Sequence, residues 1–250
     1  MNVGILTFYF ADNYGAVLQC IALQEKCKEL GCNVEIINYK PFQMITWKSR
    51  VKSLLMETKQ QKLFQAFRDE HFRMSKRSSE FDTVIVGSDQ VWNPQIIGYD
   101  DYWIKPKVKY DRICSYAASL GKSDFTGKDR EFFLSNKDDL NKYAVLTVRE
   151  SSAQKALHNI GVESKVVCDP TLLFYDKPAI YEELAGQSRL AKGKGLPQRY
   201  ILVYSLEHSN EIDKIADKLK AETGSQIVAM HPMSWSLQYS DNFFNDTNPN

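Results

Sequence analysis

The chain of 250 residues lacks several features that would assign it to particular classes of protein. No apolar run approaches the roughly 18 to 20 residues that a membrane-spanning helix needs, and no basic leader precedes the first apolar run. The formal net charge of +1 provides no overall field that would attract nucleic acid. The sequence therefore predicts a globular, cytoplasmic protein that binds no nucleic acid, does not span a membrane and touches one at most peripherally.

The cysteines and histidines show no metal-binding pattern. The five cysteines form no C-x-x-C pair, and none has a histidine at metal-ligand spacing, which predicts reduced thiols and no metal site. His71 and His158 are expected on helix surfaces. His208 and His231 each follow a predicted strand, so they are better placed for a functional role.

Short apolar runs alternate with helical patterns over the first two thirds of the chain. This alternation predicts an α/β fold with a parallel sheet of Rossmann type. Helices are expected at 14–30 and 151–159, the second with a capped N-terminus, and a basic helical excursion is expected at 47–74. The expected strands are 3–7, 34–37, 81–87, 113–117, 143–149 and 165–168.

The composition changes at 185–198, where Gly, Lys and Pro gather without periodicity. We interpret this segment as a linker between an N-terminal domain at 1–184 and a second Rossmann-like domain that begins at 199–250. One helix and two strands leave both faces of a small sheet uncovered, so we expect the chain to be a fragment of a longer one. The elements expected after the linker are strands at 200–204 and 226–230 and, between them, a helix at 209–221 that Ser209 caps and Gly224 closes.

The loops that follow strands are the candidate sites, because ligands bind at the carboxyl ends of parallel strands. The first such loop leads into a helix at Asn13, Tyr14 and Gly15. Asn13 can cap this helix, and Gly15 would let an anion approach its positive end. The alternative is that Asp12 or Asn13 serves only as an N-cap. The loop is not G-x-G-x-x-G, so it does not indicate a dinucleotide site.

The second candidate loop, GSDQVWN, directly follows a predicted strand and supplies Ser88, Asp89, Gln90, Trp92 and Asn93. Polar groups concentrated at the end of a sheet must find partners. Trp92 beside Gln90 and Asn93 resembles a sugar contact, in which an apolar ring face lies near amide groups. The alternative is a structural turn with Trp92 in the core. We favour the functional interpretation.

Three further strand ends contribute Ser119, Arg149 and Asp169. Ser119 lies among small residues that allow a ligand to approach closely. Arg149 is a fork-shaped donor suited to a carboxylate or phosphate, although pairing with Glu150 or a neighbouring aspartate is the common structural role. Asp169 is expected either to accept sugar hydroxyls or to serve as a turn residue before Pro170.

Five stretches follow one another along the chain: NYGAVLQ at 13–19, FDTVIVGSDQVWN at 81–93, SYAASLG at 115–121, VRE at 148–150 and VVCDPTLL at 166–173. Taken in this order, they resemble the polysaccharide pyruvyl transferase family. The resemblance implies two Rossmann-like domains in a glycosyltransferase B-like arrangement. It also implies transfer of the pyruvyl group of phosphoenolpyruvate, without a cofactor, to two hydroxyls of one sugar as a ketal during bacterial exopolysaccharide biosynthesis. The acceptor would be a saccharide, in either free or lipid-linked form.

The resemblance and the loop positions together assign roles to these residues. Arg149 and the helix start at Asn13 would hold the donor anions, and Asp89 and Asp169 would be the catalytic carboxylates. The other residues singled out in these loops would bind substrate. The family also has a Ser/Arg-x-His-Gly-like motif in its second domain, and neither His208 nor His231 lies in that context. We therefore expect the chain as given to be an incomplete enzyme.

Two other functions are compatible with the same architecture. One is a glycosyltransferase that uses a nucleotide sugar, because fold alone does not determine chemistry. The other is a saccharide-binding fragment without catalytic activity. A pyruvyl transferase should release phosphate from phosphoenolpyruvate, whereas neither alternative should.

Overall fold

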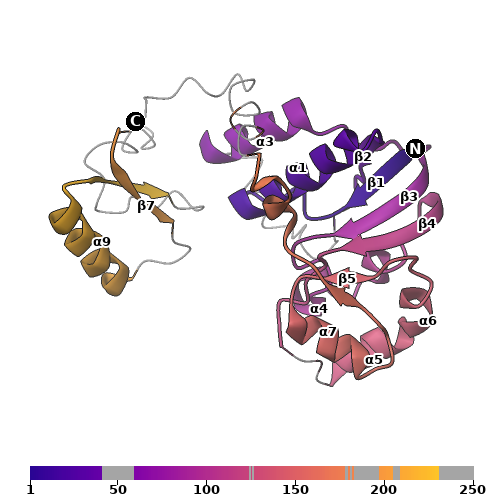
Figure 1. The fold of residues 1–250 in the computed structure, drawn as a ribbon. Helices are drawn as coiled ribbons and strands as arrows, with labels where there is room; N and C mark the ends of the chain where they lie inside the picture. The colour runs from indigo at the N-terminus through magenta and orange to yellow at the C-terminus, as the bar shows by residue number, and fades with distance from the viewer. Residues whose placement is uncertain are drawn as a thin grey trace.

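A computed structural model shows an α/β fold built on a parallel sheet (Figure 1). Most of the predicted linker, the first part of the predicted basic helical excursion, His208 and His231 lie outside the described residues. The structure describes residues 1–40, 59–123, 125, 127–177, 180, 182, 197–204 and 209–230.

Four parallel strands form the central sheet in the order β2-β1-β3-β4. From β1 the chain crosses to β2 on one side, and β3 then pairs with β1 on the other side. The strand order therefore reverses between β1 and β3, and ligands of such sheets bind outside the carboxyl ends at this switch point. The strands are β1 (Asn2–Leu6), β2 (Asn33–Ile36), β3 (Glu80–Gly87) and β4 (Lys109–Tyr116).

Two short parallel strands, β5 (Thr147–Val148) and β6 (Lys165–Val166), continue beyond β4 through isolated bridges. The strands predicted at 143–149 and 165–168 are thus shorter than expected. On the side that faces β4, side-chain hydroxyl groups of Ser115 and Thr147 take part in the hydrogen bonds between the strands. Thr147 N donates to Ser115 Oγ (2.8 Å), and Ala117 N donates to Thr147 Oγ1 (3.0 Å). Side chains thereby replace part of the regular backbone pairing.

Helices α1 (Tyr14–Glu29) and α3 (Lys59–His71) cover one face of the sheet. Val3 and Ile5 of β1 pack there against Val17 and Ile21 of α1 and Phe64 of α3. The expected helix at 14–30 is confirmed, and α3 lies within the expected excursion at 47–74.

The opposite face is covered by the short helices that Figure 1 places around β4 and β5. Leu6, Val84 and Val86 of the sheet belong to the core cluster on this side, which also contains the fully buried Trp103 and Phe133. The sheet is therefore the middle layer of three. The covering elements are α4 (Pro94–Ile97), η2 (Asp101–Trp103), α5 (Lys128–Ser135), α6 (Lys137–Leu140) and α7 (Ser151–His158).

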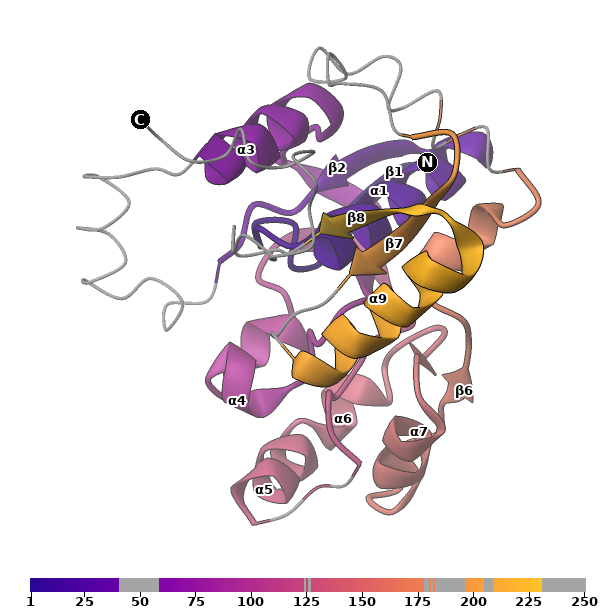
Figure 2. The same cartoon turned by 90° about the vertical axis from the view of Figure 1, so that its left-hand side faces the viewer.

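The predicted second β-α-β unit is present as β7 (Tyr200–Tyr204), α9 (Asn210–Thr223) and β8 (Gln226–Met230). The two strands pair in parallel, and Figure 2 shows α9 lying across them. Ser209 Oγ accepts from Glu211 N (3.2 Å), and Gly224 ends α9 in the left-handed region at φ 64°, so both predicted ends of the helix are confirmed.

Candidate functional site

The loops that follow β1, β3 and β4 meet at the carboxyl edge of the sheet. Thr7 Oγ1, after β1, donates to Ser88 O, after β3 (3.0 Å). Ser119 N, after β4, donates to Asp89 O (2.9 Å). Gln19 Nε2 of α1 donates to Thr7 Oγ1 (2.9 Å). Buried polar groups thus fix the loops of the strand-order switch point to one another.

The N-terminus of α1 opens at the same edge of the sheet. Asn13 Oδ1 accepts from Ala16 N (3.2 Å), so Asn13, rather than Asp12, is the N-cap that the sequence left open. Tyr14 is the first residue of the helix and is partly buried, whereas Gly15 is exposed. The first turn contains no acidic residue, so its positive end is not neutralised locally.

An ion-pair network joins the loops after β3, β4, β5 and β6. Arg149 lies at its centre: its Nε donates to Glu150 Oε1 (2.9 Å) and its Nη1 to Asp169 Oδ2 (3.2 Å). Ser119 Oγ also donates to Glu150 Oε1 (2.7 Å), and Ser88 Oγ to Asp169 Oδ2 (2.9 Å). The sequence candidates Ser88, Ser119, Arg149 and Asp169 are therefore brought together by direct contacts.

Asp169 accepts hydrogen bonds at both carboxylate oxygens. Besides Ser88 and Arg149 on Oδ2, Thr171 donates to Oδ1 through its backbone N (3.0 Å) and its Oγ1 (2.8 Å). Burial alone would raise the pKa of Asp169, but these bonds outweigh it and the pKa lies below its ordinary value. Asp169 also caps the 3-10 helix η3 (Pro170–Phe174), which confirms the turn role. Its lowered pKa makes it a weak proton acceptor.

Asp89 has a different environment from Asp169. Its Oδ1 accepts only from Gln90 N (2.8 Å), and its Oδ2 has no hydrogen bond from a described residue. Burial raises the pKa of Asp89; the Gln90 bond and the charge of Arg149 oppose this shift, and the charge of Asp169 adds to it. The backbone of Asp89 lies at φ 68°, a left-handed conformation that few residues other than glycine adopt, although aspartate tolerates it better than most.

Gln90 and Asn93 use their amide groups within the protein. Asn93 Nδ2 donates to Gln90 Oε1 (2.8 Å), while Asn93 Oδ1 caps α4 by accepting from Gln95 N (3.1 Å). Gly121, at φ +64°, packs so closely that an added Cβ would lie 2.1 Å from Gln90 Oε1. These contacts stabilise the loop that carries Asp89.

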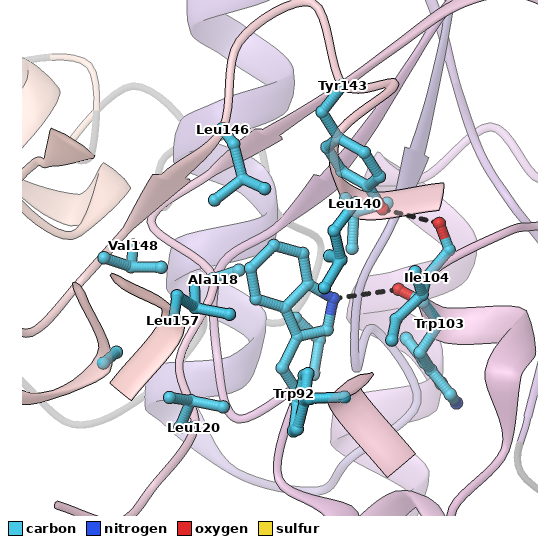
Figure 3. Packing of buried hydrophobic residues seen from close by; sticks show 14 of the residues in the cluster. Trp92, Trp103, Ile104, Ala118, Leu120, Leu140, Tyr143, Leu146, Val148 and Leu157 are labelled. Carbon is cyan, nitrogen blue, oxygen red and sulfur yellow. Dashed lines mark hydrogen bonds between the residues drawn. The ribbon is translucent and has the colours of Figure 1, made fainter. Parts of the chain in front are cut away.

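The structure places Trp92 in the core, so we correct the interpretation of this residue as a sugar contact. Its side chain is 0 % exposed, and its indole Nε1 donates to Trp103 O (3.0 Å; Figure 3). Neither ring face is open to a ligand. Ser88 and Ser119 are also 0 % exposed, and their hydroxyl groups serve the network described above. A strand-end position in the sequence does not reveal which way a side chain points.

Four contributors to this edge were not singled out as site residues from the sequence: Thr7, Gln19, Glu150 and Thr171. Thr7 and Gln19 are 0 % and 2 % exposed, and Gln19 Oε1 has no hydrogen-bond partner. The signal available for Gln19 was a glutamine on the apolar face of a predicted helix. Glu150 was considered only as an ion-pair partner of Arg149.

Two further features are absent from the described part of the chain. No helix there is long and apolar enough to cross a membrane. Among the same residues, no three His, Cys, Asp or Glu side chains are grouped so that they could hold a metal ion.

Comparison with known proteins gives one match. A family model described as polysaccharide pyruvyl transferase matches residues 13–249, which is nearly the whole chain. No curated protein and no solved structure matches significantly. The matched region begins at the N-cap of α1 and contains the loops that follow β3, β4, β5 and β6, with the whole ion-pair network.

Proposed function

This chain belongs to the polysaccharide pyruvyl transferase family, and from that membership we propose that it transfers the pyruvyl group of phosphoenolpyruvate to a saccharide as a ketal. In this reaction C3 of the donor gains a proton, two sugar oxygens bond to C2, and the bond from C2 to the phosphate oxygen breaks. Both sugar hydroxyls lose their protons. The site must therefore hold a carboxylate and a phosphate and must accept protons.

Arg149 is the proposed anion-binding residue, and the geometry of its guanidinium group is the main support for the proposed function. Glu150 and Asp169 engage its Nε and Nη1, whereas its Nη2 donates to no described residue. The side chain is 31 % exposed, so a ligand can reach it. A guanidinium held at two nitrogens can offer the third to a carboxylate or phosphate oxygen at little entropic cost. The free first turn of α1 at Asn13, Tyr14 and Gly15 is proposed to add backbone donors.

Asp89 is the proposed proton acceptor for the attacking sugar hydroxyl. Its Oδ2 is not occupied by a described residue, and its raised pKa brings it closer to the operating pH than an ordinary aspartate. Its position beside the charges of Arg149 and Asp169 would bring the hydroxyl near the bound donor. We propose that Ser88, Gln90, Asn93 and Ser119 hold this arrangement in place.

We propose a different role for Asp169 from the catalytic one expected from the sequence. Four hydrogen bonds occupy its carboxylate and its pKa is lowered, so it is poorly suited to take a proton. We propose that it orients Arg149 and balances the charge of the guanidinium. The setting that the family suggests is exopolysaccharide assembly in the bacterial cytoplasm, with a free or lipid-linked saccharide as acceptor.

Phosphate release from phosphoenolpyruvate, measured with a panel of bacterial polysaccharides and lipid-linked sugars, tests the proposal. Release should depend on the acceptor and should fall at least about tenfold in Arg149→Met, which removes a charge-assisted bond of about 1.5–3 kcal/mol. Arg73→Met is the matched control, because Arg73 pairs with Glu35 near the amino ends of the strands, away from this edge. Equal activities of Arg149→Met and the wild type would contradict the assigned site.

A further inference from the structure

We propose that Glu150 is a positioning residue that, together with Ser119, aims the Arg149 guanidinium at the donor anion. The inference rests on the proposed function, because it concerns the same site. Arg149 is fixed from two sides: Glu150 holds Nε at 2.9 Å and Asp169 holds Nη1 at 3.2 Å. If Glu150 released Nε, the long side chain could rotate and its Nη2 would lose its direction.

The carboxylate of Glu150 is itself held by the protein interior. Ser119 Oγ donates to Glu150 Oε1 at 2.7 Å, and Gly121 N donates to the same Ser119 Oγ at 3.1 Å. The bond from Gly121 occupies a lone pair of the hydroxyl and leaves its proton to point at Glu150. Ser119 is 0 % exposed, so the link from Gly121 N to Glu150 runs through a buried hydroxyl group.

Local stability does not explain a glutamate at this position. Residue 150 is the N-cap of α7, where Ser, Thr, Asp or Asn would bond to the free backbone N–H groups, yet the Glu150 side chain makes no capping bond. Its Oε2 is buried and has no hydrogen-bond partner, which is unfavourable for a carboxylate. The partly exposed ion pair with Arg149 returns little stability. The arrangement is therefore explained better by what it does to Arg149.

The positioning role has a direct spectroscopic signature that does not require any ligand. In wild-type protein labelled with ¹⁵N, the Nε–H proton of Arg149, assigned by its loss in Arg149→Lys, should be protected from exchange with solvent. Glu150→Ala should raise its exchange rate at least about tenfold, as expected when a charge-assisted bond is lost. Glu150→Gln, which keeps an acceptor oxygen, should restore part of the protection. Unchanged protection in Glu150→Ala would overturn the proposal.

Calorimetric binding of phosphoenolpyruvate separates this proposal from the function on which it rests. Glu150→Ala should weaken phosphoenolpyruvate binding at least about fivefold. The double variant Arg149→Met/Glu150→Ala should bind no more weakly than Arg149→Met alone, because Glu150 acts only through Arg149 and has nothing left to position. Glu163→Gln, a change of the same charge at a side chain that is 84 % exposed, is the matched control and should have no effect.

The outcomes distinguish the two proposals. Additive losses in the double variant, or wild-type binding by Glu150→Ala, would contradict positioning while leaving the role of Arg149 intact. Absence of phosphoenolpyruvate binding by the wild type would contradict the proposed function, and the exchange measurement would still decide whether Glu150 fixes Arg149.

Discussion

Replacing each of the two buried tryptophans with phenylalanine tests the buried hydrogen bond of Trp92 in the core. Both side chains are 0 % exposed and lie in the same cluster, so Trp92→Phe and Trp103→Phe remove the same atoms from similar surroundings. Their indole N–H groups differ. Trp92 Nε1 donates to Trp103 O at 3.0 Å, whereas Trp103 Nε1 is buried without an acceptor among the described residues.

The difference between the two free energies of unfolding follows from these N–H groups. Trp92→Phe leaves the Trp103 carbonyl without this donor, which costs about 1–3 kcal/mol. Trp103→Phe removes an unsatisfied N–H group and so avoids a penalty of about 1–3 kcal/mol. Because the cavity terms largely cancel, Trp92→Phe should be less stable than Trp103→Phe by at least about 2 kcal/mol.

Urea unfolding followed by far-UV circular dichroism measures this difference without relying on tryptophan fluorescence. The slopes of the two transitions should agree, so that the midpoints report stability alone. Equal stability of the two variants would contradict the roles assigned to the two indole N–H groups. A stable Trp92→Phe protein that had lost saccharide binding would restore the interpretation of Trp92 as a sugar contact.

Three further changes test other parts of the site. Because the pKa of Asp89 is raised, phosphate release should fall as pH drops through that pKa, and Asp89→Asn should abolish this dependence in a pH profile of the rate. The pKa of Asp169 lies below its ordinary value of 3.8, so its charged form stabilises the fold above that pH. This contribution is lost as the pH falls through the lowered pKa. The drop in melting temperature that acid causes should therefore be smaller in Asp169→Asn than in the wild type. Gly121→Ala should lower the free energy of unfolding by at least about 1 kcal/mol in a denaturant titration, because the backbone is left-handed and an added Cβ would meet Gln90. An unchanged free energy of unfolding would contradict the packing described for this loop.

The fold followed the sequence where apolar periodicity is strong and local. The helix at 14–30 and the unit from β7 to β8 appear within a residue or two of their predicted limits at most ends, because caps such as Asn13 and Ser209 define them over short distances. The strand predicted at 143–149 was too long. Its pairing depends on the hydroxyl group of Ser115, more than 30 residues away in the chain, and periodicity carries no information about such contacts.

The candidate site was predictable as a set of loops but not as a set of roles. Strand-end position correctly brought Ser88, Arg149 and Asp169 to one edge of the sheet, although Ser88 and Asp169 are 81 residues apart. It could not distinguish a carboxylate that accepts four hydrogen bonds, Asp169, from one with an oxygen that accepts none from the described residues, Asp89. Nor could it show that Trp92 points into the core, where its indole N–H group donates to the Trp103 carbonyl.

The most direct test of the proposed function is phosphate release from phosphoenolpyruvate in the presence and absence of a saccharide acceptor. Wild type, Arg149→Met and Arg73→Met are compared side by side in the full-length protein. We expect acceptor-dependent release by the wild type and by Arg73→Met, and a loss of at least about tenfold in Arg149→Met. Failure of the wild type to release phosphate with any acceptor of a broad panel would contradict the proposed function.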